Sequence, residues 1–198
     1  PKHKSLIDVY QTLSNLLDNT NQPAKNFYSL FTGHLLKSTG DSESAEKYFS
    51  SVFNDSPYAN KAFDGLLELY ISSHNLEKIN AIFDELPNPK PLLYGETLER
   101  MREFELAVKV YEEQYDLAKS NGNDSFVRIM AFRLIRCAEY AGLWELAASR
   151  LRDTLSDWKD SKGREYLNSK LHWILVEHLA ESELALETFT YLHEQNPN

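Results

Sequence analysis

The chain contains 198 residues, of which 42% are hydrophobic and 12% aromatic, and it carries a formal net charge of −9. This composition supplies enough apolar side chains for a buried core and excludes a globally disordered chain. The negative charge opposes long-range attraction to nucleic-acid phosphates and to anionic membranes. Cys137 is the single cysteine, which excludes an intramolecular disulfide and a cysteine-based zinc site. We expect a folded cytoplasmic protein without a membrane span, with a nuclear or organellar location left open.

The first predicted element is an amphipathic helix over residues 5–18. Leu6, Val9, Leu13 and Leu16 recur there at three- and four-residue steps, the spacing that places side chains on one face of a helix. A polar stretch follows and ends the helix. This helix would serve as a cap on the elements that follow or as the second half of a preceding helical pair.

From residue 26 onward the sequence repeats itself at an offset of 34 residues. The paired residues are apolar, small or proline: Gly33 with Leu67, Leu36 with Tyr70, Ala45 with Ile79, Phe49 with Phe83, Val52 with Leu86 and Pro57 with Pro91. An apolar stripe at helical spacing, a polar turn and a second apolar stripe indicate a hairpin of two helices. We predict such hairpins over residues 26–59 and 60–87.

A proline cluster separates these two hairpins from the rest of the chain. Pro87, Pro89 and Pro91 lack backbone donors, so a helix must end before them and the next begins close behind. Further hairpins are predicted over residues 88–122, 124–158 and 162–197. We expect all of these elements to form one repeat domain over residues 1–198, as part of a larger protein or assembly.

Polar residues and glycine mark the expected turns and helix starts. Asp41 or Ser42 is placed to cap the second helix of the first hairpin, because short polar side chains can accept from free N–H groups there. The cluster at residues 121–125 forms a loop that also caps the next helix. Gly142 turns the fourth hairpin.

The spacing of small, aromatic and proline residues resembles the tetratricopeptide repeat. The pattern is matched by Gly33, Leu36, Ala45, Phe49 and Pro57 and by Trp173, Val176, Ala185, Phe189 and Pro197. Ala107 with Tyr111 and Ala147 with Leu151 match it in part. The resemblance implies an all-α, right-handed superhelix of about five hairpins plus the N-terminal helix.

The same resemblance implies a concave face, lined by the first helix of each hairpin, that binds an extended or helical segment of another protein. The residues it places on this face carry charges of both signs and a few apolar side chains: Leu30, His34, Lys37, Lys61, Asp64, Glu68, Glu96, Glu99, Phe132, Arg136, Glu139, Lys170, Ile174 and Glu177. The family's clamp for a chaperone C-terminal carboxylate needs a Lys and an Asn where this chain has Leu30 and His34.

Residues 62–70 and 81–87 also look like a pentatricopeptide repeat, a family that reads single-stranded RNA one base per unit. The acidic balance, the variable unit length and the lack of a repeated basic stripe oppose this interpretation, because phosphate contacts need lysine and arginine. Nucleic acid is therefore the less favoured partner.

The sequence contains no G-x-x-x-x-G-K-[ST] phosphate loop, no G-x-S-x-G and no H-E-x-x-H. No two of its six histidines are four residues apart, the spacing that places two imidazoles on one helix face. We therefore predict no catalytic residues, no cofactor and no metal. The expected function is a scaffold or adaptor for protein–protein interaction within a multiprotein complex, and the alternatives are an RNA-binding protein or a structural segment of a large helical-repeat subunit.

Overall fold

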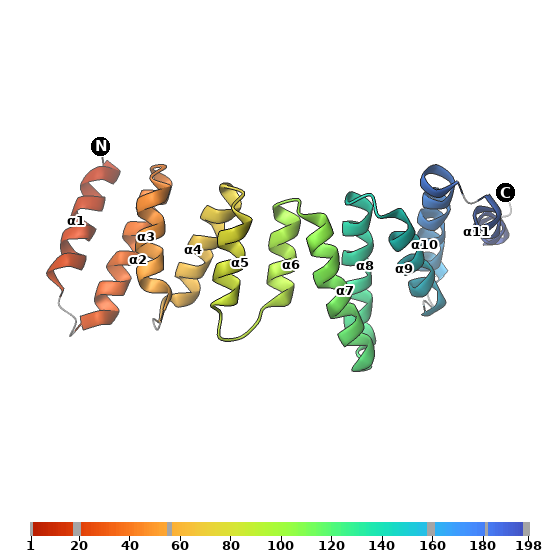
Figure 1. Cartoon of the computed structure of the whole chain (residues 1–198), viewed down its shortest axis with the longest axis horizontal. Coiled ribbons are helices and arrows are strands. Elements are labelled where there is room, and N and C mark those ends of the chain that lie inside the picture. The colour runs from red at the N-terminus through yellow and green to blue at the C-terminus, as the bar shows by residue number, and fades with distance from the viewer. Residues whose placement is uncertain (1, 18–20, 55–56, 158–160, 181, 196–198) are drawn as a thin grey trace. The chain divides into compact units, whose positions relative to one another are not determined.

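The chain is all-α, as its sequence predicts (Figure 1). The computed structural model describes residues 2–17, 21–54, 57–157, 161–180 and 182–195, and none of these lies in a β-strand. The helices in chain order are α1 (Lys2–Leu16), α2 (Gln22–Ser38), α3 (Ser42–Phe53), α4 (Ala59–Ser72), α5 (Leu76–Asp84), α6 (Pro91–Arg100), α7 (Phe104–Ser120), α8 (Asp124–Tyr140), α9 (Trp144–Asp157), α10 (Ser161–Ile174), the π-helical turn η2 (Leu175–Leu179) and α11 (Ser182–Gln195).

The helices belong to two compact units, with the division between Pro89 and Lys90. Unit 1 contains α1 to α5 and unit 2 contains α6 to α11. The sequence predicts one continuous repeat domain, whereas the structure divides inside the proline cluster. Here α5 ends at Asp84 and α6 begins at Pro91, because proline provides no donor to continue the first helix and fits the first turn of the second.

Each predicted hairpin corresponds to a pair of consecutive helices, from α2 with α3 to α10 with α11. The main difference at a helix start is in α2, which begins at Gln22 rather than at residue 26. Pro23 lies in its first turn, where a missing N–H breaks no helical hydrogen bond.

Short polar side chains cap the helices where the sequence predicts them. Asp41 accepts a hydrogen bond from the Ser44 backbone N–H at 3.1 Å and caps α3, and Asn123 accepts from the Phe126 N–H at 3.2 Å and caps α8. Gly142, in the turn before α9, has a φ of 73°, a left-handed conformation that glycine adopts without strain. The turn chemistry of these hairpins is thus encoded locally.

In unit 1 the ring of Phe49 packs between two glycines. Phe49 lies on α3 and is fully buried. A Cβ atom added to Gly33 of α2 would lie 2.7 Å from its Cε1, and one added to Gly65 of α4 would lie 2.7 Å from its Cζ. The ring therefore occupies space that any other residue at these two positions would fill.

In unit 2 Tyr111 takes the corresponding place. It lies on α7 and is fully buried, and a Cβ atom on Gly95 of α6 would lie 2.7 Å from its Cε1. Its hydroxyl donates to Glu99 Oε1 at 2.5 Å and accepts from Arg133 Nη1 at 3.2 Å. This aromatic position joins the apolar core to charged side chains at the surface.

The last hairpin departs from the repeat pattern. The helix after Ile174 continues as the π-helical turn η2, and Ala180 then adopts a left-handed φ of 52°. Trp173, Val176 and Phe189, which the repeat pattern predicts to be packing residues, are each about half exposed, so that prediction is wrong for them. Pro197 of the same pattern lies outside the described residues.

Candidate functional site

The exposed surface of α2 carries aromatic side chains at helical spacing. Phe27 and Phe31 are one turn apart and are 37% and 42% exposed. Their ring centroids lie 4.7 Å apart; Phe31 also lies 6.0 Å from Tyr10 of α1, and Phe27 lies 6.0 Å from Tyr58, which precedes α4. We call these four residues the aromatic row. They form a partly exposed aromatic surface on α1, on α2 and at the residue before α4.

His34 continues the face of α2 one turn beyond the aromatic row. It is exposed, and its imidazole contacts the edge of the buried Phe49 ring at a centroid distance of 5.0 Å. Partial burial lowers the pKa of His34, and the positive charge of Lys37 lowers it further. Next to it, Lys37 of α2 forms an ion pair with Glu68 of α4. The aromatic row is therefore followed by a face of mixed charge.

The residues predicted for the binding face of unit 1 separate into three groups. His34, Lys61 and Asp64 are exposed and can reach a partner. Lys37 and Glu68 lie on the surface but contact each other. Leu30 is only 2% exposed and lies in the helix packing, because an apolar residue on α2 is stabilised by burial.

In unit 2 three predicted residues, Glu96, Glu99 and Arg136, take part in a network of ion pairs between first helices, together with Arg133, which the sequence did not place on the binding face. Arg133 of α8 donates to Glu96 at 2.6 Å and lies 3.4 Å from Glu99, both on α6, and Arg136 of α8 also forms an ion pair with Glu99. Burial and the hydrogen bond to Glu99 raise the pKa of Tyr111 well above its ordinary value. The arrangement holds α6 and α8 together by charge.

A second pair links α8 to α10. Lys170 Nζ lies 2.8 Å from Glu139 Oε2. Of the other predicted residues here, Phe132 and Glu177 are exposed, whereas Ile174 is fully buried. Six predicted residues thus pair with one another: Lys37 with Glu68, Glu99 with Arg136, and Glu139 with Lys170. These pairs join the first helices of successive hairpins.

The remaining side chains of chemical interest are those that could bind a metal ion and the thiol of Cys137. Within the part of the chain that the structure describes, no group of three or more His, Cys, Asp or Glu is arranged to hold a metal ion. Cys137 is buried on α8, and burial raises the pKa of its thiol to about 12, so it stays protonated at neutral pH. Among the helices described, none is long and apolar enough to cross a membrane.

Sequence reasoning missed the aromatic row as a surface. Phe27 lies three residues before the apolar Leu30, so its spacing predicts a buried position on α2, and Phe31 belongs to no motif. The available signal is spacing: Phe27, Phe31 and His34 are separated by four and three residues, so they share one helix face with a residue already predicted to bind a partner.

The sequence matches no protein-family model, and comparisons with curated proteins and with solved structures also give no match. The function is therefore inferred from the chain's own residues.

Proposed function

We propose that the protein is a non-catalytic interaction scaffold that binds an extended or helical segment of a partner protein along the exposed face of α2 and α4 in unit 1. In this proposal the hairpins are tetratricopeptide-like units, and α2 and α4 are the first helices of two of them. The protein would act as a subunit or adaptor of a multiprotein complex.

The aromatic row carries this proposal. Large aromatic side chains dominate the energetics of protein interfaces, because they bury much apolar area and lose little conformational freedom on binding. Phe27 and Phe31 are held by ring contacts to Tyr10 and Tyr58, so the surface is ordered before a partner arrives. Such preorganisation favours binding without a conformational change in the scaffold.

The charged residues beyond the row would set the orientation of the partner. Lys61 and Asp64 are exposed on α4 and have opposite charge. The pair of Lys37 and Glu68 between α2 and α4 keeps that part of the face in place. A partner segment would place apolar side chains over the aromatic row and polar side chains over α4.

The test is affinity capture with wild type and with Phe27→Ser/Phe31→Ser, followed by a binding measurement with the purified captured protein. We expect the affinity for the captured protein to fall by at least about tenfold, because central aromatic contacts contribute most of the binding energy of an interface. The control is Leu117→Ser/Ile129→Ser, which removes two other exposed apolar side chains, 53% and 52% exposed, from unit 2. Equal affinity of all three proteins would contradict the proposal.

The salt dependence of RNA retention distinguishes an RNA-binding function from this proposal. A basic RNA-binding protein retains a random RNA pool at low salt and loses it steeply as salt rises. Retention of such a pool by wild type at near-physiological salt, with every captured protein lost on ribonuclease treatment, would replace the protein-scaffold proposal.

A structural role is the second candidate, and the exposed face of α1 favours it. Leu6, Val9 and Leu16 of α1 are exposed at 44%, 50% and 76%. An apolar stripe of this kind is usual where one helical repeat packs against another. Val9→Glu would then weaken assembly with neighbouring subunits while leaving binding at the aromatic row unchanged.

A further inference from the structure

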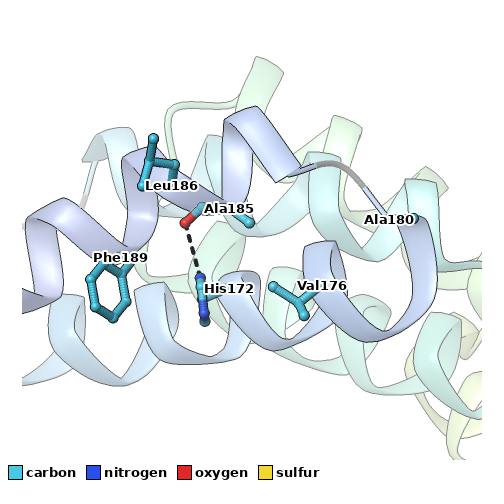
Figure 2. Close-up of a pocket in the computed structure, with 6 residues that line it drawn as sticks. All are labelled: His172, Val176, Ala180, Ala185, Leu186 and Phe189. Atoms are coloured by element: carbon cyan, nitrogen blue, oxygen red, sulfur yellow. Dashed lines mark hydrogen bonds between the residues drawn. The ribbon is translucent and has the colours of Figure 1, made fainter.

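Unit 2 contains an open apolar groove between α10–η2 and α11 (Figure 2). Its accessible volume is about 360 Å³, and its lining residues are His172, Val176, Ala180, Ala185, Leu186 and Phe189. In Figure 2 Val176 projects from the side of α10–η2, and Leu186 and Phe189 project from α11. We call this feature the α10–α11 groove. No residue of the predicted binding face lines it.

Small residues hold the two walls of the groove together. Ala185 and Thr188 of α11 are buried against α10. His172 Nδ1 of α10 lies 3.0 Å from the Ala185 carbonyl oxygen and 3.1 Å from Thr188 Oγ1. The close contact fixes the width of the groove without using its larger apolar side chains.

Those larger side chains remain accessible. Leu186 is 64% exposed, Phe189 53% and Val176 47%. They indicate a surface for a partner with apolar side chains of its own.

The surroundings of the groove are acidic. From Leu171 to Asn198 the sequence contains five glutamates and no aspartate, lysine or arginine. Among the residues described in this stretch, Glu177, Glu183, Glu187 and Glu194 are all exposed. Glu177 and Glu187 each follow a lining residue in the sequence, so each of the two walls carries an exposed glutamate on its own helix.

We propose that the α10–α11 groove binds a cationic amphipathic helix of a partner protein. Apolar side chains of that helix, spaced at three and four residues, would enter between Val176, Leu186 and Phe189. Lysine or arginine on its flanks would lie opposite Glu177, Glu183 and Glu187.

Charge and shape select this occupant over a second copy of the chain or a small molecule. A second copy carries a net charge of −9 and would bring the same glutamates toward these ones. A small molecule needs a pocket that encloses most of its surface, whereas this groove is open along one side. A helix covers such a groove and leaves its own polar face in water.

This proposal is independent of the one for unit 1, because the two surfaces share no residue. Phe27→Ser/Phe31→Ser is expected to leave binding at the α10–α11 groove unchanged. Failure of one proposal is thus distinguishable from failure of the other.

The experiment measures fluorescence anisotropy of labelled peptides titrated with the full 198-residue chain. The first peptide, of about 18 residues, has leucine at helical spacing on one face and lysine on the other. The second keeps the leucines and replaces every lysine by glutamate. The third keeps the lysines and replaces the leucines by serine. The first is expected to bind at least about tenfold more tightly than either of the others.

Three double variants locate the binding. Leu186→Ser/Val176→Ser is expected to weaken the first peptide by about tenfold or more, and Leu117→Ser/Ile129→Ser to leave it unchanged. Glu183→Lys/Glu187→Lys changes only exposed side chains and is expected to shift preference from the lysine peptide toward the glutamate peptide.

Several results would overturn the proposal. Equal binding of the lysine and glutamate peptides would remove the charge argument, and full binding by a folded Leu186→Ser/Val176→Ser protein would place the site elsewhere. Absence of binding by all three peptides would also overturn it. If light scattering shows a dimer that Leu186→Ser converts to a monomer, the occupant is a second copy instead.

Discussion

Phe49 in unit 1 and Tyr111 in unit 2 fill equivalent places with different chemistry around them. Each ring lies against a glycine of the preceding helix, Gly33 or Gly95. Four residues after that glycine comes a charged residue that pairs with the next first helix. It is Lys37, paired with Glu68, in unit 1 and Glu99, paired with Arg136, in unit 2.

The comparison separates what the hairpin requires from what it tolerates. Both units keep the glycine, the aromatic ring and an ion pair between first helices, but the sign of the pair is reversed. The pair therefore serves helix packing in both units, and its individual charges do not identify a partner. Unit 2 adds a hydroxyl that connects the ring to the pair.

The largest effect is expected on removal of the ring in unit 1. Phe49→Ala leaves a cavity between Gly33 and Gly65 that glycine cannot fill, so we expect a loss of about 3–5 kcal/mol in the free energy of unfolding. Chemical denaturation measures it. The control Phe31→Ala removes an exposed ring and should cost less than about 1 kcal/mol. Similar losses for both would show that the buried ring is not the centre of the unit.

Reversal of a charge should affect unit 2 more than unit 1. The Glu99 side chain is 15% exposed and contacts Tyr111, Arg133 and Arg136, so Glu99→Lys leaves both arginines without that acceptor. We expect a loss of about 2–3 kcal/mol in unfolding free energy. Lys37→Glu breaks a more exposed pair and should cost about 1 kcal/mol or less.

The reversed sign of the two pairs provides a stricter test. Lys37→Glu/Glu68→Lys restores a pair of the unit 2 polarity, and the double variant should recover most of the stability that the single variant loses. No recovery in a double-mutant cycle would mean that the sign matters beyond packing.

A smaller effect is expected at the glycine. Gly33→Ala gains about 1 kcal/mol of helix propensity but places its Cβ 2.7 Å from a ring that Gly65 blocks on the other side, so we expect a net loss of about 1 kcal/mol. In a Phe49→Leu background the same change should be neutral or stabilising. Additive effects in denaturation would show that the close approach has no energetic cost.

The helices and their turns could be predicted because the signals are local. Caps such as Asp41 and Asn123 lie next to the helices they start, and apolar spacing identifies each helix face within a few residues. The proline cluster also marks where the chain divides. The sequence does not show that two compact units form there, because this depends on contacts between residues far apart.

The candidate site was harder to predict, since helical spacing gives a face but not its burial. Leu30 and His34 are one turn apart on α2, yet Leu30 is buried and His34 exposed. Hydrophobicity favours that outcome for Leu30, and it would favour burial for Phe31 too, which the structure exposes. The π-helical turn after Ile174 leaves no signal in the sequence, and Val176, which lies in it, is about half exposed.

The smallest expected effect concerns His34, whose imidazole contacts Phe49, whereas the titratable contacts of Tyr111 are Glu99 and Arg133. Its pKa in the folded protein is below the ordinary 6.5, first because of partial burial and then because of Lys37. The unfolded chain therefore binds a proton more readily, so the contribution of His34 to stability is present above pH 6.5 and is lost as the pH falls through its folded pKa. Because the side chain is exposed and screened by solvent, we expect a change of about 0.5 kcal/mol or less.

Unfolding free energies of wild type and His34→Gln at pH 7.5 and 5.5 measure this contribution. His34→Gln should lose less stability on acidification than wild type. Lys37→Met should also raise the titration midpoint of His34 in an NMR experiment, because a positive charge is removed. A His34 titration midpoint at or above 6.5 in the wild-type protein would show that Phe49 and Lys37 do not disfavour the charged imidazole. The contact between His34 and Phe49 would then distinguish unit 1 from unit 2 in its geometry but not in its effect on stability.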